Sequence, residues 1–126
     1  INKVHRHLSK EVYRWKINDP YHGGVPDTYY SGPNSNCWIE YKYKQALPTK
    51  CTSKIKINLS EQQRIWLTRQ KEHGMFTYTV FASGDLVYVT EDFTLTHITV
   101  KEFNKKAVSF KNFIEALTKH CLGDKK

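Results

Sequence analysis

The sequence predicts a single α/β domain in which helices flank a mixed β-sheet. Three features indicate this fold class. The chain has 126 residues, the length of one domain with a substantial core. Runs of β-favouring residues occur on either side of a capped helical pattern in the middle of the chain, and helical spacings of apolar residues occupy both ends. The expected order is α-β-β-loop-α-β-β with a closing helix.

The first predicted element is an amphipathic helix over Asn2–Ile17. Its apolar stripe consists of Val4, Leu8, Val12 and Trp15. Glu11 lies along this stripe, where a buried and unpaired carboxylate would cost several kcal/mol. We therefore expect Glu11 at the edge of the stripe, close to a cation, or paired with a base such as His7 or Arg14.

A β-hairpin is predicted next. Pro20 ends the helix, and the paired glycines Gly23 and Gly24 allow a loop. Residues 27–30 and 37–43 are rich in aromatic and β-branched residues, and the turn formers of residues 31–36 separate them. Two strands joined by a turn are the simplest interpretation.

The hairpin carries a concentration of charged groups. Because side chains alternate along a strand, Glu40 and Lys42 share one face, while Ile39 and Tyr41 point to the other. If the turn brings Asp27 level with Glu40, two carboxylates converge, as a hard divalent cation such as Mg²⁺ requires. Lys42 would then lie beside that ion, where an ammonium group can orient a nucleophile or stabilise charge on a phosphate.

A basic loop is expected over Lys44–Ile57, followed by a helix from about Ser60 to His73. Ser60 and Gln63 form the Ser-x-x-Gln signature of a capping box, and Gly74 ends the helix. Beyond it, the remaining predicted elements are strands at Met75–Phe81 and Leu86–Val89, a further edge strand at Leu95–Val100, and a closing helix at Ser109–Cys121.

Charge points to an acidic partner. Lys and Arg number 20 against 12 Asp and Glu, for a net charge of +8 and a pI near 9.4. Nucleic acid is favoured over an anionic membrane, because no apolar run approaches the ~20 residues of a membrane span and no basic-then-apolar leader is visible. Three scattered cysteines, Cys37, Cys51 and Cys121, suit reduced thiols in the cytoplasm, with Cys37 as a packing residue.

Basic side chains near the predicted hairpin are candidates for phosphate contacts, although a merely solvated basic face is the alternative. The predicted contacts are Lys3, Arg6, Lys10, Arg14, Lys44 and Lys50.

Several motifs together resemble a known family. Pro26-Asp27 is followed thirteen residues later by Glu40-Tyr41-Lys42, then by LSEQQRIWL at residues 59–67 and by His73-Gly74. In this order they resemble the PD-(D/E)xK nuclease superfamily, and in particular its virus-type replication and repair (VRR-NUC) branch, which is similar in fold to Holliday-junction resolvases. The resemblance covers about residues 11–89.

The resemblance implies a restriction-endonuclease-like fold and a metal-dependent nuclease site. It implies Mg²⁺, with Mn²⁺ as a substitute, held by Asp27, Glu40 and the carbonyl of Ile39, with Glu11 contributing directly or through water. Lys42 would activate or orient the attacking water. A glutamine on the second helix would face the metal. Gln63 fits this role best and Gln62 is the alternative, but Gln63 could instead serve only as a cap.

The expected function is hydrolysis of phosphodiester bonds in DNA, leaving 5′-phosphate and 3′-hydroxyl ends. We expect a homodimer selective for branched DNA such as Holliday junctions, in the cytoplasm of an infected cell if the source is viral. Two alternatives stay open. One is a catalytically silent nucleic-acid-binding module, and the other is a nuclease for single-stranded, flap or RNA substrates.

Overall fold

The computed structural model describes residues 1–19 and 23–124, so the predicted helix breaker Pro20 lies outside the described residues. Within them, the helices are α1 (Asn2–His7), α2 (Glu61–Glu72), α3 (Val100–Lys106) and α4 (Phe110–Leu122). The strands are β1 (Tyr13–Lys16), β2 (Thr28–Ser31), β3 (Asn36–Tyr43), β4 (Lys54–Lys56), β5 (Thr77–Ser83), β6 (Leu86–Thr90), β7 (His97–Thr99) and β8 (Val108–Ser109).

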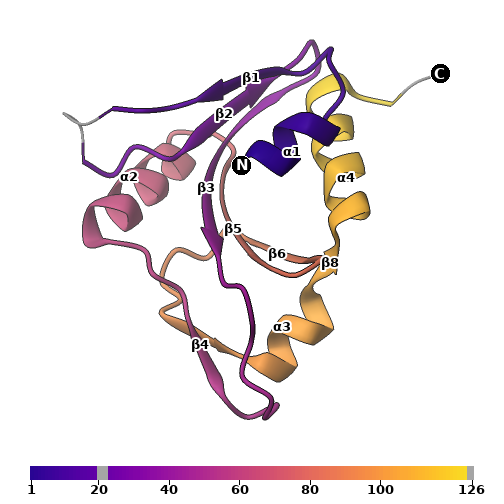
Figure 1. Cartoon of the computed structure of the whole chain (residues 1–126). Coiled ribbons are helices and arrows are strands. Elements are labelled where there is room, and N and C mark those ends of the chain that lie inside the picture. The colour runs from indigo at the N-terminus through magenta and orange to yellow at the C-terminus, as the bar shows by residue number, and fades with distance from the viewer. Residues whose placement is uncertain (20–22, 125–126) are drawn as a thin grey trace.

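A six-stranded mixed sheet organises the chain, in the order β1-β2-β3-β5-β6-β8. The pairing of β3 with β5 is parallel, with α2 in the connection between them, and the other pairs are antiparallel. Figure 1 shows α2 on one face of this sheet and α1 and α4 on the other. The predicted α/β class, a mixed sheet flanked by helices, is confirmed.

The predicted hairpin is confirmed as β2 and β3. Thr28 pairs with Ile39 and Ser31 pairs with Asn36 in an antiparallel register. The backbone N–H groups of Asn34 and Ser35, in the turn, donate to the carbonyl oxygen of Cys121 at 2.9 and 3.2 Å. The end of α4 therefore holds the tip of the hairpin.

The main core lies between the sheet and the helices α1 and α4. Val4, Leu8, Ile39, Phe113 and Leu117 are among its buried residues. Cys37 and Cys121 are free thiols in the same core, as predicted for Cys37. A hydrogen bond with the Cys121 thiol and burial raise the pKa of the Cys37 thiol.

A second core lies around a separate two-stranded sheet of β4 and β7. Ile55, Phe81, Ile98 and Phe103 pack together there. The predicted strand at Leu95–Val100 is thus wrong in extent and place. Only His97–Thr99 is a strand, and it pairs with β4 rather than with the main sheet. The hydroxyl of Thr99 accepts from the Glu102 N–H and begins α3, a helix absent from the predicted order of elements.

The prediction of one helix over Asn2–Ile17 is also wrong. The helix ends at His7, and Tyr13–Lys16 forms β1 against β2. Arg14 explains the change of direction, because its guanidinium donates to the backbone carbonyls of His5, Ser9 and Val12 and fixes the intervening turn. Pairing with β2 here outweighs the helical pattern of the sequence.

Candidate active site

Two carboxylates meet at the start of the hairpin. Asp27 immediately precedes β2, and Glu40 lies in the middle of β3. One oxygen of Asp27, Oδ2, accepts from the backbone N–H of Tyr41 at 3.0 Å, and the backbone N–H of Asp27 donates to Glu40 Oε1 at 3.2 Å. Each carboxylate is therefore fixed by the backbone of the opposite strand.

Glu40 is the centre of the polar cluster. It is buried, with 2% of its surface exposed. Its Oε2 lies 3.2 Å from Lys42 Nζ and accepts from Gln63 Nε2 at 3.1 Å. Lys42 Nζ in turn donates to Gln63 Oε1 at 3.4 Å. The side chain of Lys42 is 22% exposed, so its ammonium group links the buried carboxylate to the surface.

Gln63 caps α2 and also contacts the proposed site residues Glu40 and Lys42. Its backbone N–H donates to Ser60 Oγ at 3.1 Å, and its Oε1 accepts from the Ser60 N–H at 2.9 Å, which completes the capping box of α2. The same side chain reaches Glu40 and Lys42 through its amide. The start of α2 is thereby attached to the carboxylates.

Gln62, the alternative glutamine, lies against the loop that leads to Asp27. A Cβ atom on Gly24 would lie 2.4 Å from the carbonyl oxygen of Gln62, and Gly24 has a φ of +89°. Only glycine accommodates both the close approach and this backbone conformation. Gly24 thus lets the loop before Asp27 pack directly on α2.

The electrostatics of Glu40 suit a bound cation. Burial and the nearby charge of Asp27 raise the pKa of Glu40 to about 7, against the opposing influence of Lys42. Two carboxylates so close to each other are the hard oxygen donors that Mg²⁺ or Mn²⁺ prefers. The donor chemistry therefore fits the divalent metal, which would offset the charge that burial and repulsion disfavour.

Thr79 on β5 is a residue of this region that the sequence analysis missed. It pairs with Glu40 in the parallel register of β3 and β5. It is fully buried, and its Oγ1 has no hydrogen-bond partner among the described residues. A buried hydroxyl without a partner is costly, so Thr79, paired with Glu40 across the two strands, is a further candidate residue of this site. The signal in the sequence is two threonines, Thr77 and Thr79, in a central strand.

Two other predicted ligands lie differently. The Ile39 carbonyl accepts from Thr28 Oγ1 at 2.9 Å, which occupies one of its two lone pairs. Glu11 is in an exposed turn rather than on the first helix, and its backbone N–H donates to Ser9 Oγ at 3.3 Å. No cluster of three His, Cys, Asp or Glu side chains suited to a metal occurs within residues 1–19 and 23–124, so Glu11 does not join Asp27 and Glu40 in one.

The predicted basic contacts fall into two groups. Most are exposed, namely Lys3, Arg6, Lys10, Lys44 and Lys50, although Lys3 Nζ lies 4.3 Å from the centroid of the Phe110 ring. Arg14 is different, because the carbonyls of the α1–β1 turn already take up its guanidinium.

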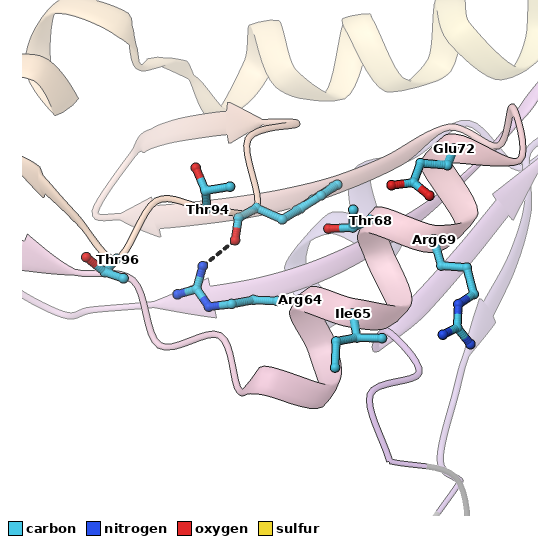
Figure 2. Close-up of a pocket in the computed structure, with 8 residues that line it drawn as sticks. Arg64, Ile65, Thr68, Arg69, Glu72, Thr94 and Thr96 are labelled. Atoms are coloured by element: carbon cyan, nitrogen blue, oxygen red, sulfur yellow. Dashed lines mark hydrogen bonds between the residues drawn. The ribbon is translucent and has the colours of Figure 1, made fainter.

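A separate surface pocket of about 490 Å³ lies on the outer side of α2 (Figure 2). Arg64 crosses it and donates to the backbone carbonyls of Phe93 and Leu95. Neither Asp27 nor Glu40 lines this pocket. Arg64 therefore attaches α2 to the loop that precedes β7. The pocket is not part of the carboxylate site.

Comparison with known proteins identifies the fold. No protein-family model matches the chain, and no curated protein matches it in sequence. Among solved structures it is similar to Hjc, a Holliday junction resolvase from the archaeal hyperthermophile Archaeoglobus fulgidus. The TM-score is 0.55 at 14% sequence identity, over 82% of this chain and 88% of that chain. This likeness confirms the restriction-endonuclease-like fold. No helix in the described part of the chain could span a membrane.

Proposed function

We propose that this protein is a metal-dependent DNA endonuclease of the PD-(D/E)xK type, with motifs of the VRR-NUC branch. The convergence of Asp27 and Glu40 beside Lys42 is the observation that carries the proposal. These residues are in the order and spacing of the motifs in the sequence, and the fold places them together at one point. The likeness to a Holliday junction resolvase supports the same class of reaction.

Asp27 and Glu40 would hold Mg²⁺ or Mn²⁺, whereas the Ile39 carbonyl already accepts from Thr28 Oγ1 and Glu11 lies in the exposed turn before β1, so neither is proposed as a ligand. When bound, the metal supplies Lewis acidity and neutralises charge on the scissile phosphate. Lys42 orients the attacking water and stabilises the phosphate charge, because its ammonium group is held at the edge of the site. Gln63 fixes the Glu40 carboxylate and, through Lys42, the direction of the ammonium group.

The proposed substrate is branched DNA such as a Holliday junction, cut by a homodimer to leave 5′-phosphate and 3′-hydroxyl ends. A net charge of +8 suits a polyanionic partner. Exposed lysines and an arginine at positions 3, 6, 10, 44 and 50 are the proposed phosphate contacts. Arg14 keeps a structural role in the α1–β1 turn.

A catalytically silent binding module is the rival from a different class. Two adjacent carboxylates repel phosphate unless a cation is present, and burial raises the pKa of Glu40 to about 7. A protein that only bound DNA would gain nothing from keeping a carboxylate in this unfavourable setting. The observation therefore favours the nuclease.

Cleavage of labelled DNA tests the proposal. A four-way junction, its matched duplex and a single strand are incubated with Mg²⁺ or Mn²⁺, using the native protein, Glu40→Ala and Lys42→Ala. Glu115→Ala and Lys111→Ala on the exposed surface of α4 are matched controls for the loss of each charge. Metal-dependent cuts near the branch that disappear only in the site variants support a junction nuclease.

Other outcomes are equally informative. If only the duplex or the single strand is cut, the nuclease proposal is supported and selectivity for junctions is excluded. Binding without cleavage of any substrate, under either metal, would establish the silent module instead.

A further inference from the structure

A row of aromatic rings covers the sheet beside the carboxylates. We call these residues the aromatic platform: Tyr13, Trp15, Tyr29, Trp38 and Trp66. Their ring centroids are separated by 6.5 Å for Tyr13 and Tyr29, 6.4 Å for Trp15 and Trp38, 4.4 Å for Tyr29 and Trp38, and 5.4 Å for Trp38 and Trp66. Each ring thus contacts at least one other, and Trp38 lies at the centre.

Strand register builds the platform next to the site. Trp15, Tyr29 and Trp38 are aligned across β1, β2 and β3. Trp38 precedes Glu40 by two residues, so the two side chains share a face, about 7 Å apart along the strand. Trp66 follows Gln63 by one turn of α2. The platform therefore begins where the carboxylate site ends.

The platform does not belong to either hydrophobic core. Tyr13 is 58% exposed and Trp15 is 46% exposed, and the other three rings are partly exposed. Contiguous exposed rings of this extent on a soluble domain usually mark a binding surface. A platform of tyrosine and tryptophan with no aliphatic residue is suited to stacking against flat ring systems.

The charged residues around the platform indicate which kind of ligand could bind to it. Lys42 shares the face of Trp38 on β3, and Arg69 is exposed one turn beyond Trp66 on α2, whereas Lys16 points to the opposite face from Trp15. Glu40, the carboxylate of the proposed metal site, is the only acidic residue of β1, β2 and β3. Aromatic rings combined with cations are how proteins bind single-stranded nucleic acid.

We propose that the aromatic platform stacks against unpaired nucleobases of the strand that enters the carboxylate site. This inference deepens the proposed nuclease function and takes the identity of the reacting strand from it. Bases in an intact duplex are already stacked on each other and cannot reach the rings. The platform therefore selects DNA with unpaired nucleotides close to the scissile phosphate over continuous duplex, and a junction meets the rings only where bases at its branch point are unpaired.

Binding of a fluorescein-labelled oligothymidylate to the full chain, in EDTA so that no cleavage occurs, tests the platform. We expect Trp15→Ala and Tyr13→Ala each to weaken binding by about 5- to 30-fold, as for loss of one stacked base. Trp15→Phe keeps a ring and should retain most of the affinity. Phe76→Ala is the matched control, because Phe76 is also 46% exposed but its ring lies against His120 of α4, on the opposite face of the sheet, although its carbonyl accepts from the Trp38 N–H.

Salt dependence separates stacking from charge. Loss of a ring should lower the affinity at every salt concentration and leave the slope of log K against log salt unchanged, whereas loss of a phosphate contact reduces that slope. Quenching of tryptophan fluorescence on binding is also expected, and it should decrease in Trp15→Ala. Equal affinity of the native protein, Trp15→Ala and Tyr13→Ala would overturn the proposal.

The platform and the nuclease can fail separately. Metal-dependent cleavage by the native protein combined with unchanged binding by Trp15→Ala would refute the platform and keep the nuclease. Ring-dependent binding without cleavage of any DNA would keep the platform and refute the nuclease. A dimer in light scattering that dissociates in Trp15→Ala, with oligothymidylate binding unaltered, would identify the rings as a contact between protein chains and overturn the proposal.

Discussion

The Gln63 amide donates to Glu40 at 3.1 Å while its own oxygen accepts from the first N–H of the helix cap at 2.9 Å. One side chain thus completes both the helix and the site. The position of α2 and the orientation of the buried carboxylate cannot vary independently.

Substitution of Gln63 tests its contribution to both the helix cap and the site. Gln63→Glu retains an acceptor for the Ser60 N–H but places a second carboxylate against Glu40, whereas Gln63→Ala removes both interactions. We expect Gln63→Ala to lose about 1 kcal/mol of unfolding free energy through the cap, with a roughly tenfold slower cleavage rate. Single-turnover cleavage and thermal unfolding with Mg²⁺ measure the two effects. Cleavage by Gln63→Ala at the native rate would show that the Glu40 contact is only structural.

Glu40 should make the metal-free protein less stable as pH rises. Its pKa is raised from 4.5 to about 7 in the folded state, so folding binds the proton more tightly. The contribution of Glu40 protonation to the free energy of unfolding is therefore fully present below pH 4.5. It is lost as pH rises through about 7 and is absent at higher pH. The loss is of the order of 3 kcal/mol. Urea unfolding in EDTA at pH 5 and pH 8 measures it.

Glu40→Gln is the control for that titration. This variant should not lose unfolding free energy between pH 5 and pH 8. At pH 8 without metal it should be more stable than the native protein, although we expect it not to cleave DNA. Addition of Mn²⁺ should stabilise the native protein and leave Glu40→Gln unaffected. An identical pH dependence in both proteins would contradict the role of Glu40.

Thr79 should affect cleavage more than folding. Thr79→Val is nearly isosteric and removes a buried hydroxyl that has no described partner, so its unfolding free energy should match or exceed the native value by about 1 kcal/mol. If the hydroxyl positions a water or ligand atom beside Glu40, the cleavage rate falls about tenfold, and Thr79→Ser restores it. Rates are compared at saturating Mg²⁺. Full activity of Thr79→Val would exclude this role.

We expect Gly24→Ala to lower the free energy of unfolding more than Gly74→Ala, although the two glycines have nearly the same φ. Gly24 and Gly74 have φ values of +89° and +87°, but a Cβ at Gly24 meets the Gln62 backbone at 2.4 Å while a Cβ at Gly74 has nothing within 4 Å. Gly74→Ala should cost about 1 kcal/mol from backbone strain alone. Gly24→Ala should cost about 2 kcal/mol more and also slow cleavage, because the loop to Asp27 must move. Chemical denaturation of both variants decides the comparison.

The sequence alone predicts the elements whose signals are local. The turn formers between Tyr30 and Cys37 define the hairpin, and the capping pair Ser60 and Gln63 defines the start of α2. Alternation along β3 correctly places Glu40 and Lys42 on one face. These features depend on neighbouring residues, so local patterns contain them.

The predictions from sequence are wrong or incomplete where contacts between distant segments determine the structure. The apolar spacing from Val4 to Trp15 fits a helix, but β1 gains its hydrogen bonds from β2, which is more than ten residues away. The misplacement of Glu11 follows from that error. Likewise, Thr79 becomes notable only through its pairing with Glu40 across a parallel connection, and no local pattern reports such a pairing.

The attachment of the hairpin tip to the end of α4 has a consequence for biosynthesis. Asn34 and Ser35 donate to the Cys121 carbonyl, and Asn34 Nδ2 donates to the His120 carbonyl at 3.1 Å, near the other end of the sequence. During synthesis the strand pair that bears the carboxylates is made before α4, so its tip gains these hydrogen bonds only once α4 has been made. A chain that ends before α4 keeps Asp27, Glu40 and Lys42 but lacks these contacts at the hairpin tip.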